Sequence, residues 1–315
     1  MPLGGVSVED GVRHYPILFF IPPRHMRWGY VRTGVFDGEG RRLDLWPILI
    51  SNGSRFPVGP RRLASLPDER FSEGYIYAGA YYPGFGHFIT ETLVNLVAIA
   101  PTLRAHPQRK ILFVLPTPGT LKRVFKGPHE DHFFAKLGIS REQIVFVTQL
   151  AGYEDVLVPK APFEKKFTYR SWIVKELDKL DVSRVDGPRK VYFSRSRWPK
   201  PRVVDEEHIE GLFSDAGYEI VHPQELPLDE QFALMRNVTH LAGSQGTALH
   251  LSLYSPTARS VISLGWKSPL QAGICRVRGQ RFVDPRGMMV SFKMPRLRRV
   301  SDRAVRKAIE RVAGG

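Results

Sequence analysis

The second half of the chain alternates between short apolar runs and longer segments in which apolar positions have helical spacing. The apolar runs have the length of buried strands, and they cover residues 190–194, 218–221, 239–242 and 260–264. The segments with helical spacing lie between them, at residues 205–216, 228–237 and 247–253. Strands separated by helices predict a parallel sheet with right-handed crossovers, and ligands of such sheets bind outside the carboxyl ends of the strands.

The first half of the chain mixes strands and helices less evenly. Apolar runs bounded by turn residues predict strands at 15–22, 31–35, 43–46, 75–78, 110–115, 144–147 and 155–158. Helical spacing predicts a long helix over 87–99, which Pro101 ends, and a shorter helix at 131–137. The segment 165–186 is charged and helical in pattern, and Asp186-Gly187-Pro188 interrupts it.

These patterns predict an α/β protein of two domains followed by a basic helix. At roughly 150 residues per domain, a chain of 315 residues suggests two domains. We place an N-terminal α/β domain at residues 1–186, a C-terminal Rossmann-like domain at 187–290 and a basic C-terminal helix at 291–315.

The composition is that of a globular protein. Hydrophobic residues make up 43% of the chain, and no apolar run approaches the roughly 20 residues of a membrane-spanning helix. Glu9 and Asp10 stand where a signal peptide would carry basic residues, and the single cysteine, Cys275, cannot form an internal disulfide. We therefore expect a soluble, cytoplasmic protein.

The charge balance indicates anionic partners. The 46 Lys and Arg residues exceed the 31 Asp and Glu residues, which gives a formal net charge of +15. Seven of the basic residues lie between Arg296 and Arg311, around a modest apolar stripe. Such a segment can lie on an anionic membrane surface, as on the inner face of the plasma membrane, or pack back across the other domain with its charges in water.

One loop at the expected carboxyl edge suits a phosphate. Gly243-Ser244-Gln245-Gly246-Thr247 follows a predicted strand and opens a predicted helix. Its glycines let a ligand approach the backbone, and the amides of the first helical turn point outward. Taken alone, the same residues also fit a tight turn capped by Ser244 or Thr247.

A second loop at the same edge carries arginines. Ser194 and Arg195 follow the strand at 190–194, and Arg202 comes shortly afterwards. Guanidinium groups at the end of a strand suit a diphosphate, because they offer paired hydrogen bonds and a permanent charge. A solvated basic loop is the alternative, and the convergence of both loops on one edge favours the ligand.

A third candidate lies at the start of the long apolar helix. The helix N-terminus disfavours the imidazolium form of His87 and leaves the ring able to accept a proton. Glu91 lies one turn further on the same face, where it could orient His87 or act as the base itself. The alternative is that His87 caps the helix and Glu91 is a hydrogen-bonded carboxylate at the edge of the core.

The sequence indicates no metal site. His129-Glu130-Asp131-His132 lacks the spacing of zinc-protease ligands, and the chain contains no Asp-x-Asp pair. We expect neither a metal nor another cofactor.

Several of these motifs stand in a recognisable order. The segments are 86–91, 189–195, 202–206, 217–231 and 243–249. Together they resemble glycosyltransferase family 61, which shows a strand ending in Ser-Arg, then Arg-x-x-Asn-Glu, and later a Gly-x-His-Gly-Ala-x-Leu turn. Gln245 replaces the family's histidine, Asp205 its first asparagine, and Leu251 stands where an asparagine often occurs. No role of the turn histidine is therefore carried over.

The resemblance implies two facing Rossmann-like domains of GT-B type and an inverting transfer that needs no metal. It implies that His87 and Glu91 are catalytic. The implied contacts to a nucleotide-sugar donor come from Ser194, Arg195, Arg202, Glu225, Ser244, Gln245, Gly246 and Thr247. The expected reaction moves a sugar from a UDP donor to a hydroxyl of a glycan or lipid-linked acceptor in polysaccharide biosynthesis.

The charge leaves one alternative open, a non-enzymatic protein that binds nucleic acid or a nucleotide. The aromatic residues are not interleaved with basic ones as in nucleic-acid-binding signatures. We therefore expect no nucleic-acid partner.

Overall fold

The computed structural model describes most of the chain. The described residues are 7–25, 30–46, 55–57, 60–165, 167–180, 186–187, 189–199, 203–265, 268–285, 289–290 and 298–313. Arg202 and Arg296, both singled out by the sequence, lie outside these ranges.

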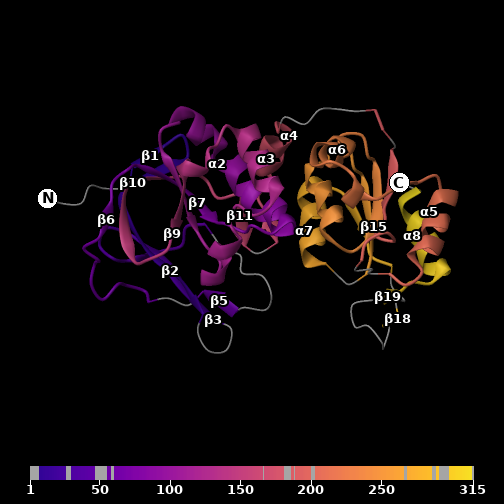
Figure 1. The fold of residues 1–315 in the computed structure, drawn as a ribbon, viewed down its shortest axis with the longest axis horizontal. Helices are drawn as coiled ribbons and strands as arrows, with labels where there is room; N and C mark the ends of the chain where they lie inside the picture. The colour runs from indigo at the N-terminus through magenta and orange to yellow at the C-terminus, as the bar shows by residue number, and fades with distance from the viewer. Residues whose placement is uncertain are drawn as a thin grey trace. The chain divides into compact units, whose positions relative to one another are not determined.

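The chain divides into two compact units, Met1–Lys166 (unit 1) and Phe167–Gly315 (unit 2) (Figure 1). Each contains a sheet with parallel strands together with helices, so the chain is of the α/β class.

Unit 1 is built on a mixed sheet. The strands of this sheet are β1 (Ser7–Glu9), β2 (Val12–His25), β3 (Tyr30–Phe36), β4 (Arg42–Leu43), β5 (Arg55–Pro57), β6 (Arg70–Phe71), β7 (Tyr75–Ala80), β8 (Lys110–Val114), β9 (Ile144–Val147) and β10 (Ala151–Val158). The strand β11 (Phe163–Lys165) lies outside it. The main path through the sheet is β4-β3-β2-β10-β7-β8-β9. Strands β10, β7, β8 and β9 pair in parallel, whereas β2 and β3 extend the sheet with antiparallel pairing. The parallel part of the sheet carries the loop after β7 that leads to His87.

The helices of unit 1 include one long helical stretch with a change of pitch. The helices are α1 (Phe85–His87), the π-helical η2 (Phe88–Thr92), α2 (Leu93–Ala105), η3 (Pro118–Arg123), α3 (Pro128–Leu137) and η4 (Arg141–Gln143). The prediction that Pro101 ends the long helix is wrong, because α2 continues to Ala105. Pro101 is exposed while Thr102 and Leu103 after it are buried, and their packing offsets the backbone hydrogen bond that proline cannot donate.

The stretch Phe85–Ala105 is 21 residues long and apolar enough to cross a membrane by length and composition. However, 78% of its most apolar window is buried inside the protein. Such burial is typical of the core helix of a soluble unit.

Unit 2 contains the predicted parallel sheet. Its strands are β13 (Lys190–Phe193), β14 (Glu219–Val221), β15 (His240–Ser244), β16 (Ser260–Leu264) and β17 (Arg281–Val283), in the order β14-β13-β15-β16-β17. All these pairings are parallel. The order corresponds to 2-1-3-4-5, a doubly wound arrangement in which the direction of winding reverses between the first and the third strand.

The remaining elements of unit 2 surround this sheet. They are β12 (Thr168–Tyr169), α4 (Trp172–Asp178), α5 (Glu206–Asp215), η5 (Pro223–Glu225), α6 (Leu228–Leu234), the 3₁₀ helix η6 (Thr247–Tyr254), α7 (Pro269–Arg278), β18 (Met289–Val290), β19 (Arg298–Arg299) and α8 (Asp302–Ala313). Residues 167–180, which the sequence assigns to the first domain, contact this unit: β12 packs on α7, and α4 packs on η6.

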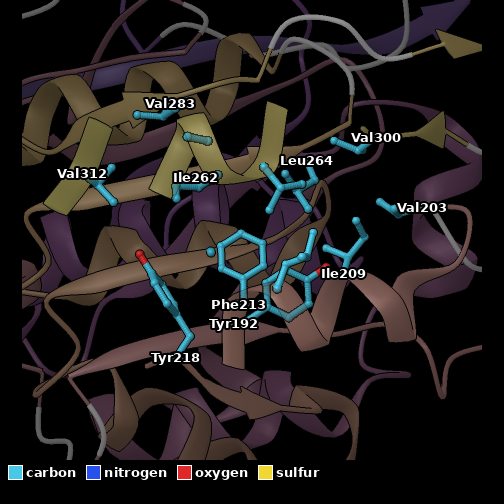
Figure 2. Packing of buried hydrophobic residues seen from close by; sticks show 14 residues of the cluster. Tyr192, Val203, Ile209, Phe213, Tyr218, Ile262, Leu264, Val283, Val300 and Val312 are labelled. Carbon is cyan, nitrogen blue, oxygen red and sulfur yellow. The ribbon is translucent and has the colours of Figure 1, made fainter. Parts of the chain in front are cut away.

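The core of unit 2 extends from the sheet to the last helix (Figure 2). Tyr192 stacks on Phe213 of α5, with ring centroids 4.5 Å apart. Val305 and Val312 of α8 are buried in the same cluster. The apolar stripe of α8 therefore packs within unit 2 itself, and its basic residues Arg303, Arg306, Lys307 and Arg311 are exposed.

Candidate functional site

The two phosphate-type loops of unit 2 lie on neighbouring strands. β13 pairs with β15 in parallel, and Phe193 is opposite Gly243. The loop that begins at Ser194 and the turn that begins at Ser244 therefore leave the sheet side by side at its carboxyl edge. This is also where the winding reverses, because β14 lies on one side of β13 and β15 on the other. In doubly wound sheets this position is the usual ligand crevice.

Arg195 lies directly against the Gly246 turn. A Cβ atom added to Gly246 would stand 2.7 Å from Nη1 of Arg195, closer than real Cβ atoms approach other atoms. Arg195 is partly buried and Gly246 is partly exposed. The structure thus brings a guanidinium group together with the backbone of the turn, and glycine is what permits the approach.

The amides of the turn are not all available to a ligand. The Gln245 amide donates a hydrogen bond to the Leu264 carbonyl, 2.7 Å away. The amides of Gly246 and Thr247 stand at the start of η6, before the first residue whose amide can bond within the helix. Of the amides of Gln245, Gly246 and Thr247, those of Gly246 and Thr247 could therefore serve a ligand, whereas the amide of Gln245 is already bonded within the sheet edge.

Ser194 and Ser244 occupy buried positions below the two loops. The Ser194 side chain is inaccessible to solvent, and its hydroxyl donates to Glu210 and accepts a hydrogen bond from the Ser196 amide. Ser244, at the end of β15, is 3% exposed. In this geometry Ser194 shapes the turn that carries Arg195.

Glu206 is a buried carboxylate that ends the 202–206 motif and to which the sequence analysis gave no role. Its Oε1 atom accepts hydrogen bonds from the Arg195 amide (3.0 Å) and the Tyr192 hydroxyl (3.1 Å). Burial raises the pKa of Glu206, against the opposing effect of the bond from the Arg195 amide. Asp205 before it has a left-handed backbone, φ 56°, which Asn and Asp tolerate best among residues with side chains. That tolerance accounts for Asp at the position where the family motif has Asn.

The loop after β14 contributes further polar groups at the same edge. Glu225 forms an exposed ion pair with Arg197, with 2.9 Å between Oε2 and Nη1. His222 Nδ1 and Gln224 Nε2 are buried, and neither has a hydrogen-bond partner among the residues that the structure describes. Groups of this kind are costly unless something pairs with them, so this loop is compatible with a polar ligand.

In unit 1, His87 and Glu91 form a hydrogen-bonded pair. The distance between His87 Nδ1 and Glu91 Oε2 is 2.7 Å. The Glu91 side chain is 3% exposed and that of His87 is 41% exposed. Both residues lie where α1 passes into the wide π turn η2. A buried carboxylate therefore orients a partly exposed imidazole.

The surroundings of this pair lie at the carboxyl edge of the parallel strands of unit 1. The Tyr82 ring is 5.7 Å from that of His87, and burial together with the charge of Glu91 raises the pKa of Tyr82 well above its usual range. A Cβ atom on Gly84 would lie 3.3 Å from Nη2 of Arg123, which ends η3 after the neighbouring strand β8. A neutral phenol and an exposed cation thus lie near the imidazole.

Two other features complete the description of the two units. Among the described residues, no group of three or more His, Cys, Asp and Glu side chains could hold a metal ion, and His129 donates to the Pro83 carbonyl, 2.9 Å away. A polar hollow of about 640 Å³ opens at the amino ends of the strands of unit 2, beside Arg189 and Arg259. No predicted site residue lines it.

A comparison with known protein families identifies the family of the chain. A family model described as Glycosyltransferase 61 matches residues 85–262, which is more than half of the chain and contains every residue that the sequence predicts to be catalytic or donor-binding. No curated protein matches the chain.

Proposed function

The chain belongs to glycosyltransferase family 61, and from this membership we propose that it transfers a sugar from a UDP donor to a hydroxyl of a glycan or lipid-linked acceptor. The transfer would invert the anomeric configuration and serve polysaccharide biosynthesis. Membership makes the chain a glycosyltransferase; the donor, the acceptor and the stereochemistry are the proposal.

The observation that carries the donor site is the approach of Arg195 to Gly246 at the crevice between β13 and β15. A leaving diphosphate gains negative charge as the glycosidic bond to the donor breaks. The Arg195 guanidinium and the Gly246 and Thr247 amides would stabilise that charge, and their fixed orientation lowers the cost of doing so. We propose that this fixed positive charge takes the place of a metal ion.

We propose the His87–Glu91 pair as the base. Glu91 accepts the Nδ1 proton of His87, which leaves Nε2 as the proton acceptor. Nε2 takes the proton of the acceptor hydroxyl while its oxygen forms a bond to the anomeric carbon. The bond from that carbon to the diphosphate oxygen breaks, and the diphosphate leaves with the electron pair. Attack from the opposite side inverts the configuration.

We further propose that the two units have the facing, GT-B-type arrangement that the resemblance implies. In that arrangement the acceptor side belongs to unit 1 and the donor side to unit 2. The carboxyl edges that carry His87 and Arg195 would then border one cleft.

The test separates binding from chemistry. Arg195→Ala should weaken UDP binding, measured by calorimetry, and lower turnover while the thermal unfolding curve stays close to that of the parent. His87→Ala should abolish sugar transfer while UDP still binds. UDP binding without turnover by the parent protein would favour a nucleotide-binding role instead, and loss of UDP binding in His87→Ala would make His87 structural.

We propose a cytoplasmic location with peripheral association at the inner face of the plasma membrane. Arg303, Arg306, Lys307 and Arg311 are exposed on α8. Because Val305 and Val312 are buried, the contact would be electrostatic, at about 1 kcal/mol per basic residue near the surface. Flotation with phosphatidylserine vesicles should therefore decline steeply with added salt, and binding that resists salt would contradict this mode.

A further inference from the structure

We propose that Glu206 is a positioning residue of the donor site, whose buried carboxylate holds the backbone of Arg195 so that the guanidinium lies against Gly246. This inference rests on the proposed donor site and adds to it a residue that does not itself touch the donor.

The first step of the argument is the contact between Glu206 and Arg195. Glu206 Oε1 accepts a hydrogen bond from the Arg195 amide, with 3.0 Å between the atoms. It also accepts one from the Tyr192 hydroxyl, 3.1 Å away, and Tyr192 lies within β13. One carboxylate oxygen is therefore fixed to the strand and to the first residues of the loop that follows it.

The second step concerns the cost of placing a carboxylate there. Glu206 is 4% exposed, and burying a charged group is unfavourable unless it is well paired. The Ser244 hydroxyl lies close to the same carboxylate and lowers its pKa, although it is outside ordinary hydrogen-bond geometry. Arg195 also acts on it as a nearby charge. The groups that offset the cost of burying the Glu206 charge thus come from three places: Tyr192 of β13, Ser244 of β15, and Arg195 in the loop that follows β13.

The third step is that α5 holds this loop at two points. Glu210 lies one turn after Glu206 on the same helix and accepts the Ser194 hydroxyl. Glu206 fixes the next residue, Arg195, through its amide. Two consecutive residues of the loop are thereby bound to one helix face, and the side chain of Arg195 leaves this fixed backbone toward Gly246.

The experiment compares two substitutions of Glu206. Glu206→Gln keeps an oxygen that can accept from Tyr192 and Arg195, whereas Glu206→Met keeps the length and removes the acceptor. We expect Glu206→Gln to bind UDP within about threefold of the parent and Glu206→Met to bind about tenfold more weakly, the loss expected when a charge-assisted contact to phosphate is misplaced. Acceptor KM should change in neither variant.

Glu130 provides a matched control. It is fully buried in unit 1 and accepts hydrogen bonds from the Tyr81 hydroxyl and the amides of Phe125 and Gly127. Glu130→Met removes the same kinds of contact from a carboxylate of the other unit that bonds to neither donor loop, so it should lower the unfolding temperature and leave UDP affinity unchanged. If Glu130→Met weakens UDP binding as much as Glu206→Met does, the effect is general destabilisation and the proposal falls.

A double-mutant cycle with Arg195→Ala tests whether Glu206 acts through Arg195. In the Arg195→Ala background, Glu206→Met should weaken UDP binding no further, whereas additive losses would overturn the proposal. Equal losses in Glu206→Gln and Glu206→Met would overturn it too. If Arg195→Ala alone leaves UDP binding intact, the donor site itself is misassigned, which is a different failure.

If Glu206→Met does not fold, Tyr192→Phe tests the proposal in its place. It removes one hydroxyl that fixes Glu206 and retains the buried ring. UDP binding should weaken severalfold, and unchanged binding would refute the positioning role.

Discussion

Gly246→Ala is the most direct test of the donor site, because it alters the approach of Arg195 without removing any polar group. The added Cβ would stand 2.7 Å from Arg195 Nη1. The Gly246 backbone is extended, with φ 168° and ψ −178°, a conformation that alanine also adopts. The guanidinium is the far end of a flexible side chain, so it can move away, and the fold should lose less than about 1 kcal/mol.

The effect on the donor should be much larger than the effect on the fold. A hydrogen bond to a charged group contributes roughly 1.5–3 kcal/mol, and every 1.4 kcal/mol is tenfold in affinity. Displacing Arg195 should therefore weaken UDP binding by roughly 10- to 100-fold. Calorimetric titration with UDP measures the affinity, and thermal unfolding monitors the fold.

Gly211→Ala serves as the control for this experiment. Gly211 lies within α5, and an added Cβ there would meet nothing within 4 Å. Alanine at such a helical position should stabilise the fold by about 0.5–1 kcal/mol and leave UDP affinity unchanged. If Gly246→Ala bound UDP like the parent, the guanidinium would not act at this place and the donor site would have to be sought elsewhere.

Four further outcomes follow from the same contacts. Gly243→Ala should destabilise the fold by about 1–3 kcal/mol in chemical denaturation, since its Cβ would lie 2.6 Å from the Phe193 carbonyl oxygen and the backbone must shift; wild-type stability would refute this. Glu91→Gln should lower kcat about 10- to 100-fold with UDP affinity retained, and an unchanged kcat would remove Glu91 from the mechanism. Burial lowers the pKa of His129 from its ordinary 6.5, so the unfolded chain binds more protons below that pH; stability should fall on acidification through pH 6.5, and less so in His129→Gln. Val305→Ala should cost about 2 kcal/mol in unfolding free energy, because this side chain of α8 is fully buried, whereas a negligible cost would mean that α8 is not part of the core.

The sequence predicted the sheet of unit 2 closely because its pattern is local. Each strand is a short apolar run, and the observed bounds of β13 and β16 differ from the prediction by a residue at most. The segment 247–253 was predicted as an ordinary helix and is the 3₁₀ helix η6. Helical spacing alone does not distinguish these two forms.

The failures depend on contacts between distant residues. Only Trp172–Asp178 of the predicted helical segment 165–186 is helical within the described residues, because charged periodicity indicates an exposed face without determining what it packs on. The helix α2 continues through Pro101 because Thr102 and Leu103 after it are buried in the core.

The same distinction between local pattern and distant contacts applies to the candidate site. The two loops could be placed at one edge from strand order alone, and so could Arg195. The role of Glu206 depends on how α5 packs against β13, which no local pattern encodes. His222 and Gln224 were missed for the same reason, since what draws attention to them is one buried nitrogen atom of each that has no hydrogen-bond partner among the described residues.

The π turn between α1 and α2 amounts to one extra residue wound into an otherwise regular helix. Deleting Thr92, which follows both members of the pair, would restore α-helical winding, and the segment before the deletion would rotate by about 100° around the axis of α2. The imidazole of His87 would then face another direction although its chemistry is intact. The direction in which the proposed base points thus depends on the number of residues in the π turn. Shortening that turn by one residue would therefore inactivate the enzyme while both members of the pair remain in place.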